Sequence, residues 1–341
     1  MPNRPRRSSG PSPVSPRKGP AARRHGLTRR ALGVLLLVAA VAARAVEGPA
    51  YETLDLEWVD PGRQRSVPVR LYLPRGASAD KPAPLVVFSH GIGGSRQGYR
   101  YLGSHWASQG FASLHLQHVG SDRNLWFGNV FGIVGRLQGA AQEGEAIARV
   151  QDLSFALDRI AAGDLASRID LSRIVAAGHS YGANTTLLAA GARVERQGRM
   201  VDLRDPRIKA AIVISAPPFY GESAPGHILG SVTVPTLHIT ATEDVIRIPG
   251  YYSGAQDRLA VFDATGSARK VLAVFEGGSH SMFTDRAGTG GATLNPQVKA
   301  ATQELSLAFM RQVFDGDAAA LRQWPERFRS IVARFADLTG R

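Results

Sequence analysis

One serine lies between two glycines in a segment suited to nucleophilic chemistry. Residues 178–182 read Gly-His-Ser-Tyr-Gly, which has the pattern Gly-x-Ser-x-Gly. The segment follows the apolar run Ile174–Ala177 and precedes the small-residue run Ala183–Ala192. A strand that turns so tightly into a helix needs glycine two residues either side of the serine, because side chains there would collide with neighbouring backbone. The pattern therefore predicts that Ser180 is a nucleophile raised above a sheet, beside a helix N-terminus.

A serine nucleophile needs a base, because its hydroxyl is weakly reactive at neutral pH, and an acid must orient that base. In a strand–turn–helix context of this kind the chain order is serine, acid, histidine. That order excludes His25, His90, His105, His115, His118 and His179. Of the rest, His238 lies within an apolar run, and His227 lies in the Gly/Pro loop before that run. His280 ends the segment Glu276–His280, which contains two glycines and follows the last apolar run. We predict that His280 is the general base.

The orienting acid should follow the strand that precedes the histidine. The apolar run Thr236–Thr240 leads into Ala-Thr-Glu-Asp and offers two adjacent carboxylates, Glu243 and Asp244. We predict that Asp244 is the acid, with Glu243 as the first alternative and Asp263 as the second.

Acyl transfer also needs two backbone N–H donors that are in place before negative charge develops on the substrate oxygen. The residue after the nucleophile, Tyr181, should supply one. The other should come from the loop after the first central strand, where Ser-His-Gly-Ile-Gly-Gly occupies residues 89–94. We predict Ile92 as that second donor, with Gly91 or Gly93 as alternatives.

Metal and nucleotide chemistry have weaker support in this sequence. His115 and His118 are three residues apart on an apparent strand, so their side chains should face opposite sides. There is no His-Glu-x-x-His pattern, and Gly91–Gly94 lacks the Lys-Ser/Thr of a phosphate-binding loop. The chain contains no cysteine, which excludes disulfides, thiolate metal ligands and a cysteine nucleophile. No cofactor or metal is expected.

The elements that must position these residues alternate between strands and helices. Residues 51–59 and 66–73 alternate apolar and polar side chains, which predicts an edge hairpin. Apolar runs typical of buried parallel strands occupy residues 85–89, 111–116, 174–177, 211–215, 236–240 and 270–275. Helical spacing lies between them, at residues 147–157 and 305–313. This order predicts a single α/β domain over residues 46–341, a mostly parallel doubly wound sheet with an antiparallel N-terminal edge.

The chain is expected to end in an amphipathic helix that packs onto this domain. Its apolar side chains are Leu321, Trp324, Phe328, Ile331, Val332 and Phe335. Binding of this helix to a membrane or a partner is the alternative.

The basic charge of the chain belongs to its N-terminus. The 341 residues carry a formal charge of +13, and residues 1–45 hold ten basic and no acidic side chains. Subtracting these ten from 13 leaves +3 for residues 46–341, an ordinary surface charge that gives no case for nucleic-acid binding. Residues 1–26, rich in Pro, Ser, Gly and Arg, are expected to be disordered.

The residues after this tail predict an export signal. Arg29 and Arg30 directly precede the apolar stretch Ala31–Ala43, which is too short for a comfortable membrane span, and Ala43-Arg44-Ala45 fits a signal-peptidase site. We therefore expect export to the periplasm or the medium by the twin-arginine route, with cleavage after Ala45. A general-secretion signal or a basic nucleic-acid-binding arm are the alternatives. The sequence contains no run of about 18 apolar residues, so it predicts no ordinary membrane span.

Several of these motifs together resemble a known group of enzymes. Val87–Arg96 with Tyr99 and Tyr101, the pattern Arg-x-x-Asp-x-x-Phe-x-Leu-Asp at 149–158, and the Ser180, Asp244 and His280 positions resemble the dienelactone-hydrolase-like branch of the α/β hydrolases. That branch includes platelet-activating-factor acetylhydrolases and bacterial polyester hydrolases or cutinases, and the resemblance spans residues 51–315.

The resemblance implies ester hydrolysis through an acyl-enzyme on Ser180, Asp244 and His280, with Ile92 and Tyr181 at the oxyanion hole. It has two departures. True dienelactone hydrolases use a cysteine nucleophile, and cutinase-type relatives often carry a disulfide near the C-terminus, whereas this chain has no cysteine.

A further stretch, Ser121–Gly139, is apolar and punctuated by glycine. Its Trp126 and Phe127 are candidates for lining an acyl pocket or forming a flap, and packing is the alternative.

The sequence thus predicts an exported serine carboxylic-ester hydrolase that acts on short or medium acyl esters. Small-molecule, lipid and polyester esters all remain open as substrates, as does the oligomeric state. One rival is an amidase or peptidase with the same triad, and another is a non-catalytic binding protein on a hydrolase fold.

Overall fold

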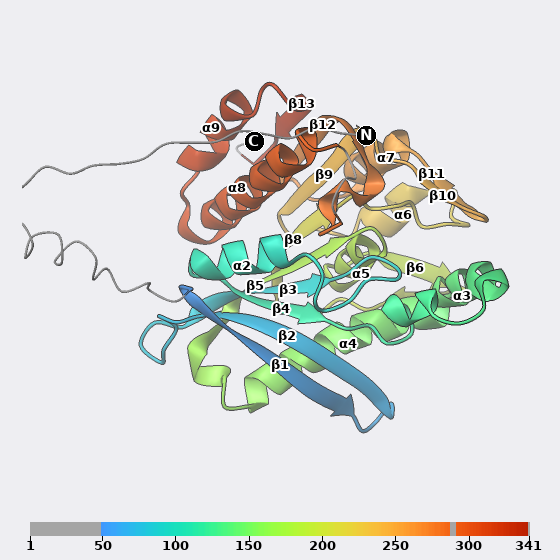
Figure 1. Cartoon of the computed structure of the whole chain (residues 1–341), viewed down its shortest axis with the longest axis horizontal. Coiled ribbons are helices and arrows are strands. Elements are labelled where there is room, and N and C mark those ends of the chain that lie inside the picture. Colours follow the sequence, from blue (N-terminus) through green and yellow to red (C-terminus); the bar gives the residue numbers. More distant parts are fainter. Residues whose placement is uncertain (1–48, 287–290, 340–341) are drawn as a thin grey trace, which may run out of the picture. The chain divides into compact units, whose positions relative to one another are not determined.

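The computed structural model describes residues 49–286 and 291–339. Within them, nine strands form one sheet in the order β1-β2-β4-β3-β5-β8-β9-β12-β13 (Figure 1). The strands from β4 to β12 are parallel, while β1, β2 and β13 pair antiparallel with their neighbours. The strands of this sheet are β1 Tyr51–Asp60, β2 Arg65–Pro74, β3 Ala83–Ser89, β4 Ala112–Leu116, β5 Ile169–His179, β8 Ile208–Ile214, β9 Thr236–Glu243, β12 Lys270–Ser279 and β13 Val332–Asp337.

Helices cover both faces of the sheet (Figure 1). Because successive strand residues point to opposite faces, Leu85 and Val87 of β3 join the core under α4 and α5, while Val86 and Phe88 join the core under α2 and α8. A strand covered on both faces must be apolar throughout, which explains the unbroken apolar runs in the sequence. The helices are α2 Arg100–Ser108, α3 Ile133–Ala140, α4 Glu143–Ala162, α5 Tyr181–Ala189, α6 Pro225–Leu229, α7 Ala255–Ala264, α8 Leu294–Asp315 and α9 Ala319–Arg327.

Short elements in the connections add to this framework. Two hairpins stand apart from the main sheet: β6 (Arg193–Arg196) pairs with β7 (Arg199–Asp202), and β10 (Ile246–Ile248) pairs with β11 (Tyr251–Ser253). The 3-10 turns are η1 Arg123–Trp126, η2 Val130–Gly132, η3 Ala166–Arg168 and η4 His280–Phe283. The sequence did not predict either of these hairpins.

The predicted fold class is confirmed. The N-terminal hairpin forms the antiparallel edge, and each of the six apolar runs lies on or overlaps a parallel strand. Among the described residues, no helix is both long enough and apolar enough to cross a membrane. The predicted tail and export signal, residues 1–45, lie outside the described residues.

The predicted C-terminal helix is only partly correct. Leu321 and Trp324 lie on α9, which ends at Arg327, but Val332 and Phe335 lie on β13. This strand pairs antiparallel with β12, whose edge would otherwise present unpaired N–H and C=O groups. The side chains still pack as expected, because the rings of Trp324 and Phe335 lie 5.4 Å apart.

Buried histidines give the fold a dependence on pH. Burial lowers the pKa of His115, His179 and His238 to about 3, whereas an unfolded histidine has a pKa of about 6.5. Between these values the unfolded chain binds more protons than the folded chain. The free energy of unfolding should therefore decrease as pH falls from about 6.5 towards 3.

His238 tests this expectation outside the candidate site. It is buried in β9, where its Nε2 lies 3.2 Å from Thr236 Oγ1. His238→Gln should make the dependence of unfolding free energy on pH shallower by up to about 1.4 kcal/mol per pH unit, because one titrating group is removed. Urea titrations at pH 7, 6 and 5 measure this slope. Equal slopes in the wild type and His238→Gln would contradict the prediction.

Candidate active site

Ser180 lies on a sharp turn between β5 and α5. Its backbone has a φ of 56° and a ψ of −125°, a conformation that L-residues rarely adopt. A Cβ on Gly178 would lie 2.1 Å from the Gly182 carbonyl oxygen, and a Cβ on Gly182 would lie 1.9 Å from the Ser89 carbonyl oxygen. Both glycines are therefore required by close backbone approach, the reason for which the sequence pattern singled them out.

His280 and Asp244 lie next to Ser180 in the folded chain. His280 Nε2 lies 2.8 Å from Ser180 Oγ, and His280 Nδ1 lies 2.7 Å from Asp244 Oδ1. His280 follows β12 directly, after Gly277 and Gly278, whose φ values of 66° and 81° turn the chain over the sheet. The structure thus brings together the three residues predicted as a triad.

The two alternative acids lie elsewhere. Glu243 ends β9 with an exposed side chain, and Asp263 is exposed on α7. Asp244 is buried. Burial alone would raise its pKa, but the hydrogen bond from His280 and the nearby charge of Arg258 outweigh this effect and hold the pKa of Asp244 well below its usual range. Asp244 is therefore a carboxylate that can accept the Nδ1 proton of His280.

Ser215 is a polar partner of the site that the sequence did not predict. It follows β8 with a φ of 56°, and its hydroxyl donates to Asp244 Oδ2. The same hydroxyl oxygen lies 2.8 Å from His280 Nδ1, so the Nδ1 proton is shared between Asp244 and Ser215. Thr240 Oγ1 donates to the same carboxylate oxygen at 2.8 Å. A serine at a strand end is too common to be recognised from sequence, and only the adjacency of β8 and β9 reveals its position.

Within the segment Gly91–Gly94 of the glycine loop after β3, one N–H is left for a substrate. Gly91 N–H donates to Tyr99 Oη at 3.3 Å, Gly93 N–H to the Ser121 carbonyl at 2.8 Å, and Gly94 N–H to the Gly91 carbonyl at 3.0 Å. Among the described residues, Ile92 N–H has no such partner. This pattern favours Ile92 over its alternatives Gly91 and Gly93 as the oxyanion donor.

Tyr181 offers the second N–H. It is the first residue of α5, where the helix has no carbonyl for its amide, and the helix dipole favours negative charge at this end. Both predicted donors, Ile92 and Tyr181, line the same cavity as Ser180 and His280.

Buried side chains hold the glycine loop in this shape. His90 Nδ1–H donates to the Gly91 carbonyl at 2.7 Å, and its Nε2 accepts from His118 N–H at 3.2 Å. Arg149 is fully buried on α4 and donates to the His90 carbonyl, to Ser121 Oγ at 2.7 Å and to Thr185 Oγ1 at 2.9 Å. Arg149 therefore ties the glycine loop to α5.

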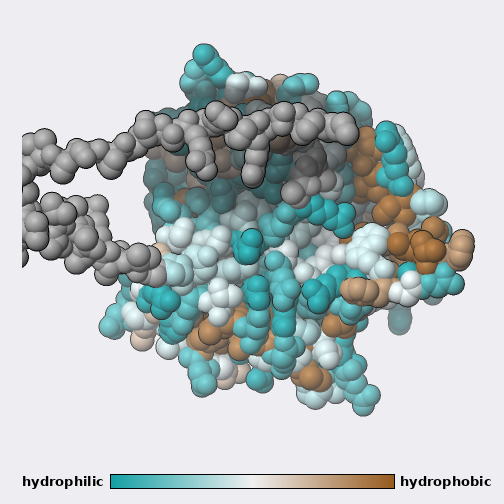
Figure 2. Space-filling model, viewed as in Figure 1, coloured by the Kyte–Doolittle hydropathy of each residue, from teal (hydrophilic) through white to brown (hydrophobic). Residues whose placement is uncertain are grey.

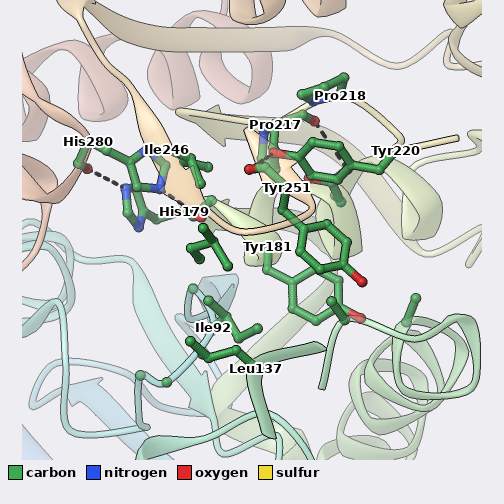
Figure 3. A pocket seen from close by; sticks show the side chains of 18 of the residues that line it. Ile92, Leu137, His179, Tyr181, Pro217, Pro218, Tyr220, Ile246, Tyr251 and His280 are labelled. Atoms are coloured by element: carbon green, nitrogen blue, oxygen red, sulfur yellow. Dashed lines mark hydrogen bonds between the residues drawn. The ribbon is translucent and has the colours of Figure 1, made fainter. Parts of the chain in front are cut away.

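A cavity of about 960 Å³ opens beside the Ser180 hydroxyl. Figure 3 shows Ile92, Leu137, Ile246 and Tyr251 directed into it. Its apolar and aromatic wall comes largely from the connections between strands: the stretch after β4, the hairpin β6–β7, the loop after β8 and the hairpin β10–β11. The wall includes Leu137, Ile147, Leu188, Val194, Val201, Leu203, Phe219, Tyr220 and Ile248.

The two predicted substrate-binding residues differ in position. Trp126 lines the cavity, and its Nε1–H donates to the Gly93 carbonyl at 2.7 Å. Phe127 does not line it and is 67% exposed. Together with Val130, Phe131 and Val134 it forms an exposed apolar surface, visible at the right edge of Figure 2 over η2 and α3.

Two comparisons with known proteins bear on the fold of this chain. Residues 67–124 match the model of a family described as platelet-activating factor acetylhydrolase, isoform II. A ferulic acid esterase from Streptomyces cinnamoneus is 23% identical, with a TM-score of 0.57 over 82% of this chain and 94% of the esterase chain. The fold is that of an α/β hydrolase. The search of curated proteins gives no match.

These matches cover the scaffold better than the reacting residues. The family match includes the glycine loop with Ile92 but ends before Ser180, Asp244 and His280. The structural match extends over most of the α/β-hydrolase fold but, at 23% identity, speaks for the fold alone. Among the described residues, no group of three or more His, Asp or Glu side chains is arranged to hold a metal ion.

Ser215→Ala tests the shared Nδ1 proton. The substitution removes one acceptor from His280 and one donor to the charged Asp244, a loss expected to lower kcat about tenfold, since hydrogen bonds to charged groups contribute about 1.5–3 kcal/mol. KM should change little, because Ser215 is not part of the cavity wall. Initial rates on an ester substrate measure both constants. Ser172→Ala, at a serine on β5 whose hydroxyl donates to Asp170, is the control, and an unchanged kcat in Ser215→Ala would contradict the expectation.

Proposed function

We propose that this chain is a serine carboxylic-ester hydrolase that works through an acyl-enzyme. The observation that carries the proposal is the continuous chain from Ser180 Oγ through His280 to Asp244, beside a cavity that Ile92 and Tyr181 also line. The matched family is described as an acetylhydrolase and the matched structure as an esterase, which supports the same reaction class.

The geometry supports the following sequence of steps. Ser180 Oγ attacks the ester carbonyl carbon while His280 Nε2 accepts its proton, and Asp244 stabilises the imidazolium that forms. The carbonyl oxygen becomes an oxyanion that accepts from the N–H groups of Ile92 and Tyr181. The tetrahedral intermediate collapses, and His280 returns its proton to the leaving alcohol. Water, deprotonated by His280, then attacks the acyl-enzyme to release the carboxylic acid and regenerate Ser180.

The cavity supports esters with an apolar acyl group of short or medium length. Its wall offers apolar side chains on several elements, and burial of each CH₂ group of a substrate is worth about 0.8 kcal/mol. Trp126 connects the exposed apolar surface around Phe127 to the glycine loop.

Ser180→Ala is the direct test of the proposal. Removal of the nucleophile should lower turnover of p-nitrophenyl esters by about 10⁶-fold, as for triads in other serine hydrolases. Rates on p-nitrophenyl esters from acetate to palmitate, with circular dichroism to check folding, measure this loss and define the preferred acyl length. Hydrolysis that survives Ser180→Ala undiminished would contradict a serine mechanism.

The same assays separate the rival functions. Matched ester and anilide substrates distinguish an esterase from an amidase or peptidase, because a faster anilide reaction would favour the latter. A wild-type protein that hydrolyses neither would favour a non-catalytic binding protein on a hydrolase fold.

We further propose export with cleavage after Ala45. The support is the sequence of residues 28–45 and the start of the first strand at Tyr51, which leaves the ordered domain intact after cleavage. Mass spectrometry of protein secreted from a bacterial host should find Val46 as the first residue. In Arg29→Lys/Arg30→Lys the yield of exported protein should fall if the twin-arginine route is used, and an intact Met1 in exported protein would contradict the cleavage.

A further inference from the structure

Two buried residues outside the triad, Tyr99 and His179, lie between the glycine loop and His280. Tyr99 precedes α2 with a φ of 57°, and His179 ends β5 directly before Ser180. Both are almost completely buried, at 4% and 3% exposure. The reaction steps above use neither side chain. Their hydrogen bonds nevertheless connect the two parts of the site that must act together.

Each of these hydrogen bonds has a defined direction. The Gly91 N–H donates to Tyr99 Oη at 3.3 Å. His179 Nε2 lies 3.0 Å from the His280 carbonyl oxygen, which can only accept, so the His179 proton is on Nε2. His179 Nδ1 then carries a lone pair and accepts from the Tyr99 hydroxyl at 2.8 Å. The chain of donors therefore begins at the Gly91 amide and ends at the His280 carbonyl.

We propose that Tyr99 and His179 are positioning residues that tie the glycine loop after β3 to the backbone of His280. We call the hydrogen bonds from Gly91 through Tyr99 and His179 to His280 the relay. Its role rests on the proposed ester-hydrolase function. It fixes the His90–Gly91 peptide, which directly precedes the peptide that carries the Ile92 N–H, in a loop that lines the cavity together with Ser180. It also holds the His280 backbone, from which the imidazole reaches both Ser180 and Asp244.

The relay has a second consequence for His280. The rings of His179 and His280 lie 4.8 Å apart, side by side in Figure 3. A positive charge on His179 would oppose the imidazolium that forms on His280 during the reaction. Burial lowers the pKa of His179 to about 3, so the ring is neutral, and the Tyr99 hydroxyl occupies the nitrogen that a second proton would need.

The test compares Tyr99→Phe, His179→Phe and the double variant. Tyr99→Phe keeps the ring that packs on Phe88, with centroids 4.6 Å apart, and removes only the hydroxyl. Each single variant should lower kcat about 10- to 100-fold, less than the 10²- to 10³-fold expected for loss of an oxyanion donor, while KM changes less than about twofold. Because both residues act through one relay, the double variant should cost no more than about threefold beyond the worse single variant.

Tyr101→Phe is the matched control. Tyr101 lies on α2 two residues after Tyr99, and its hydroxyl donates to the Phe283 carbonyl at 3.0 Å, so the same group and a similar hydrogen bond are removed outside the relay. Its kcat should stay within about twofold of the wild type. A loss in Tyr101→Phe as large as in Tyr99→Phe, or multiplied losses in the double variant, would overturn the relay. A raised KM with unchanged kcat in Tyr99→Phe would do so as well, because it would indicate substrate contact.

A measurement without substrate separates this inference from the proposed function. In ¹⁵N NMR of histidine-labelled protein, His179 should show a protonated Nε2 and an unprotonated, hydrogen-bonded Nδ1, and the Nδ1 resonance should shift in Tyr99→Phe. A proton on Nδ1 overturns the relay whatever the activity. Failure of the wild type to hydrolyse esters would instead count against the proposed function, and the NMR result would still decide the direction of the hydrogen bonds. The NMR measurement also tests the relay if His179→Phe fails to fold, because it uses the wild type and Tyr99→Phe.

Discussion

The close packing of Gly182 against the Ser89 carbonyl oxygen is the constraint on which the site depends. A side chain at position 182 would bring a Cβ to 1.9 Å from that oxygen, so the first turn of α5 can rest directly on the end of β3 only because the residue is glycine. The chain leaves β3 at this point and enters the glycine loop. One contact therefore brings Ser180, Tyr181 and Ile92 to the same cavity, and the order of the parallel strands adds Asp244 and His280, which directly follow β9 and β12.

A glycine-rich loop cannot be held by side-chain packing of its own, so buried polar groups must hold it. Besides Arg149, the support runs through His118, whose backbone N–H donates to His90 and whose Nδ1 lies 3.1 Å from Asp152 Oδ2. Asp152 is fully buried and also accepts from Arg63 at 2.8 Å and Arg65 at 2.9 Å. Arg63 lies in the turn between β1 and β2, and Arg65 is the first residue of β2. The antiparallel edge of the sheet, distant in sequence from Ser180, thus contributes to the shape of the glycine loop after β3, because an unpaired charge on buried Asp152 would be costly.

The sequence predicts best those parts whose residue types have few other uses. Glycines two residues either side of Ser180, and a histidine in a glycine loop after the last apolar run, leave few alternatives, and the structure brings those residues together. Ser215 was missed because its role follows from the adjacency of β8 and β9, which no local pattern reports. The wrong prediction of a helix at Val332 and Phe335 has a related cause. Their spacing suits a helix, but the segment forms a strand because it pairs with the open edge of β12.

The division between sheet and connections explains why the reaction is easier to infer than its substrate. The polar groups proposed to carry the reaction lie at the ends of β3, β5, β9 and β12, where the sheet fixes them. The wall of the cavity comes largely from the stretch after β4 and from the hairpins β6–β7 and β10–β11, which connect those strands without shaping the sheet. The matched structure, 23% identical and covering 82% of the chain, therefore speaks for the fold of the sheet and not for the connections that line the cavity. If the proposed ester hydrolysis holds, we expect the choice of acyl group to depend on residues of these connections, such as Leu137, Val194 and Ile248, rather than on the residues around Ser180.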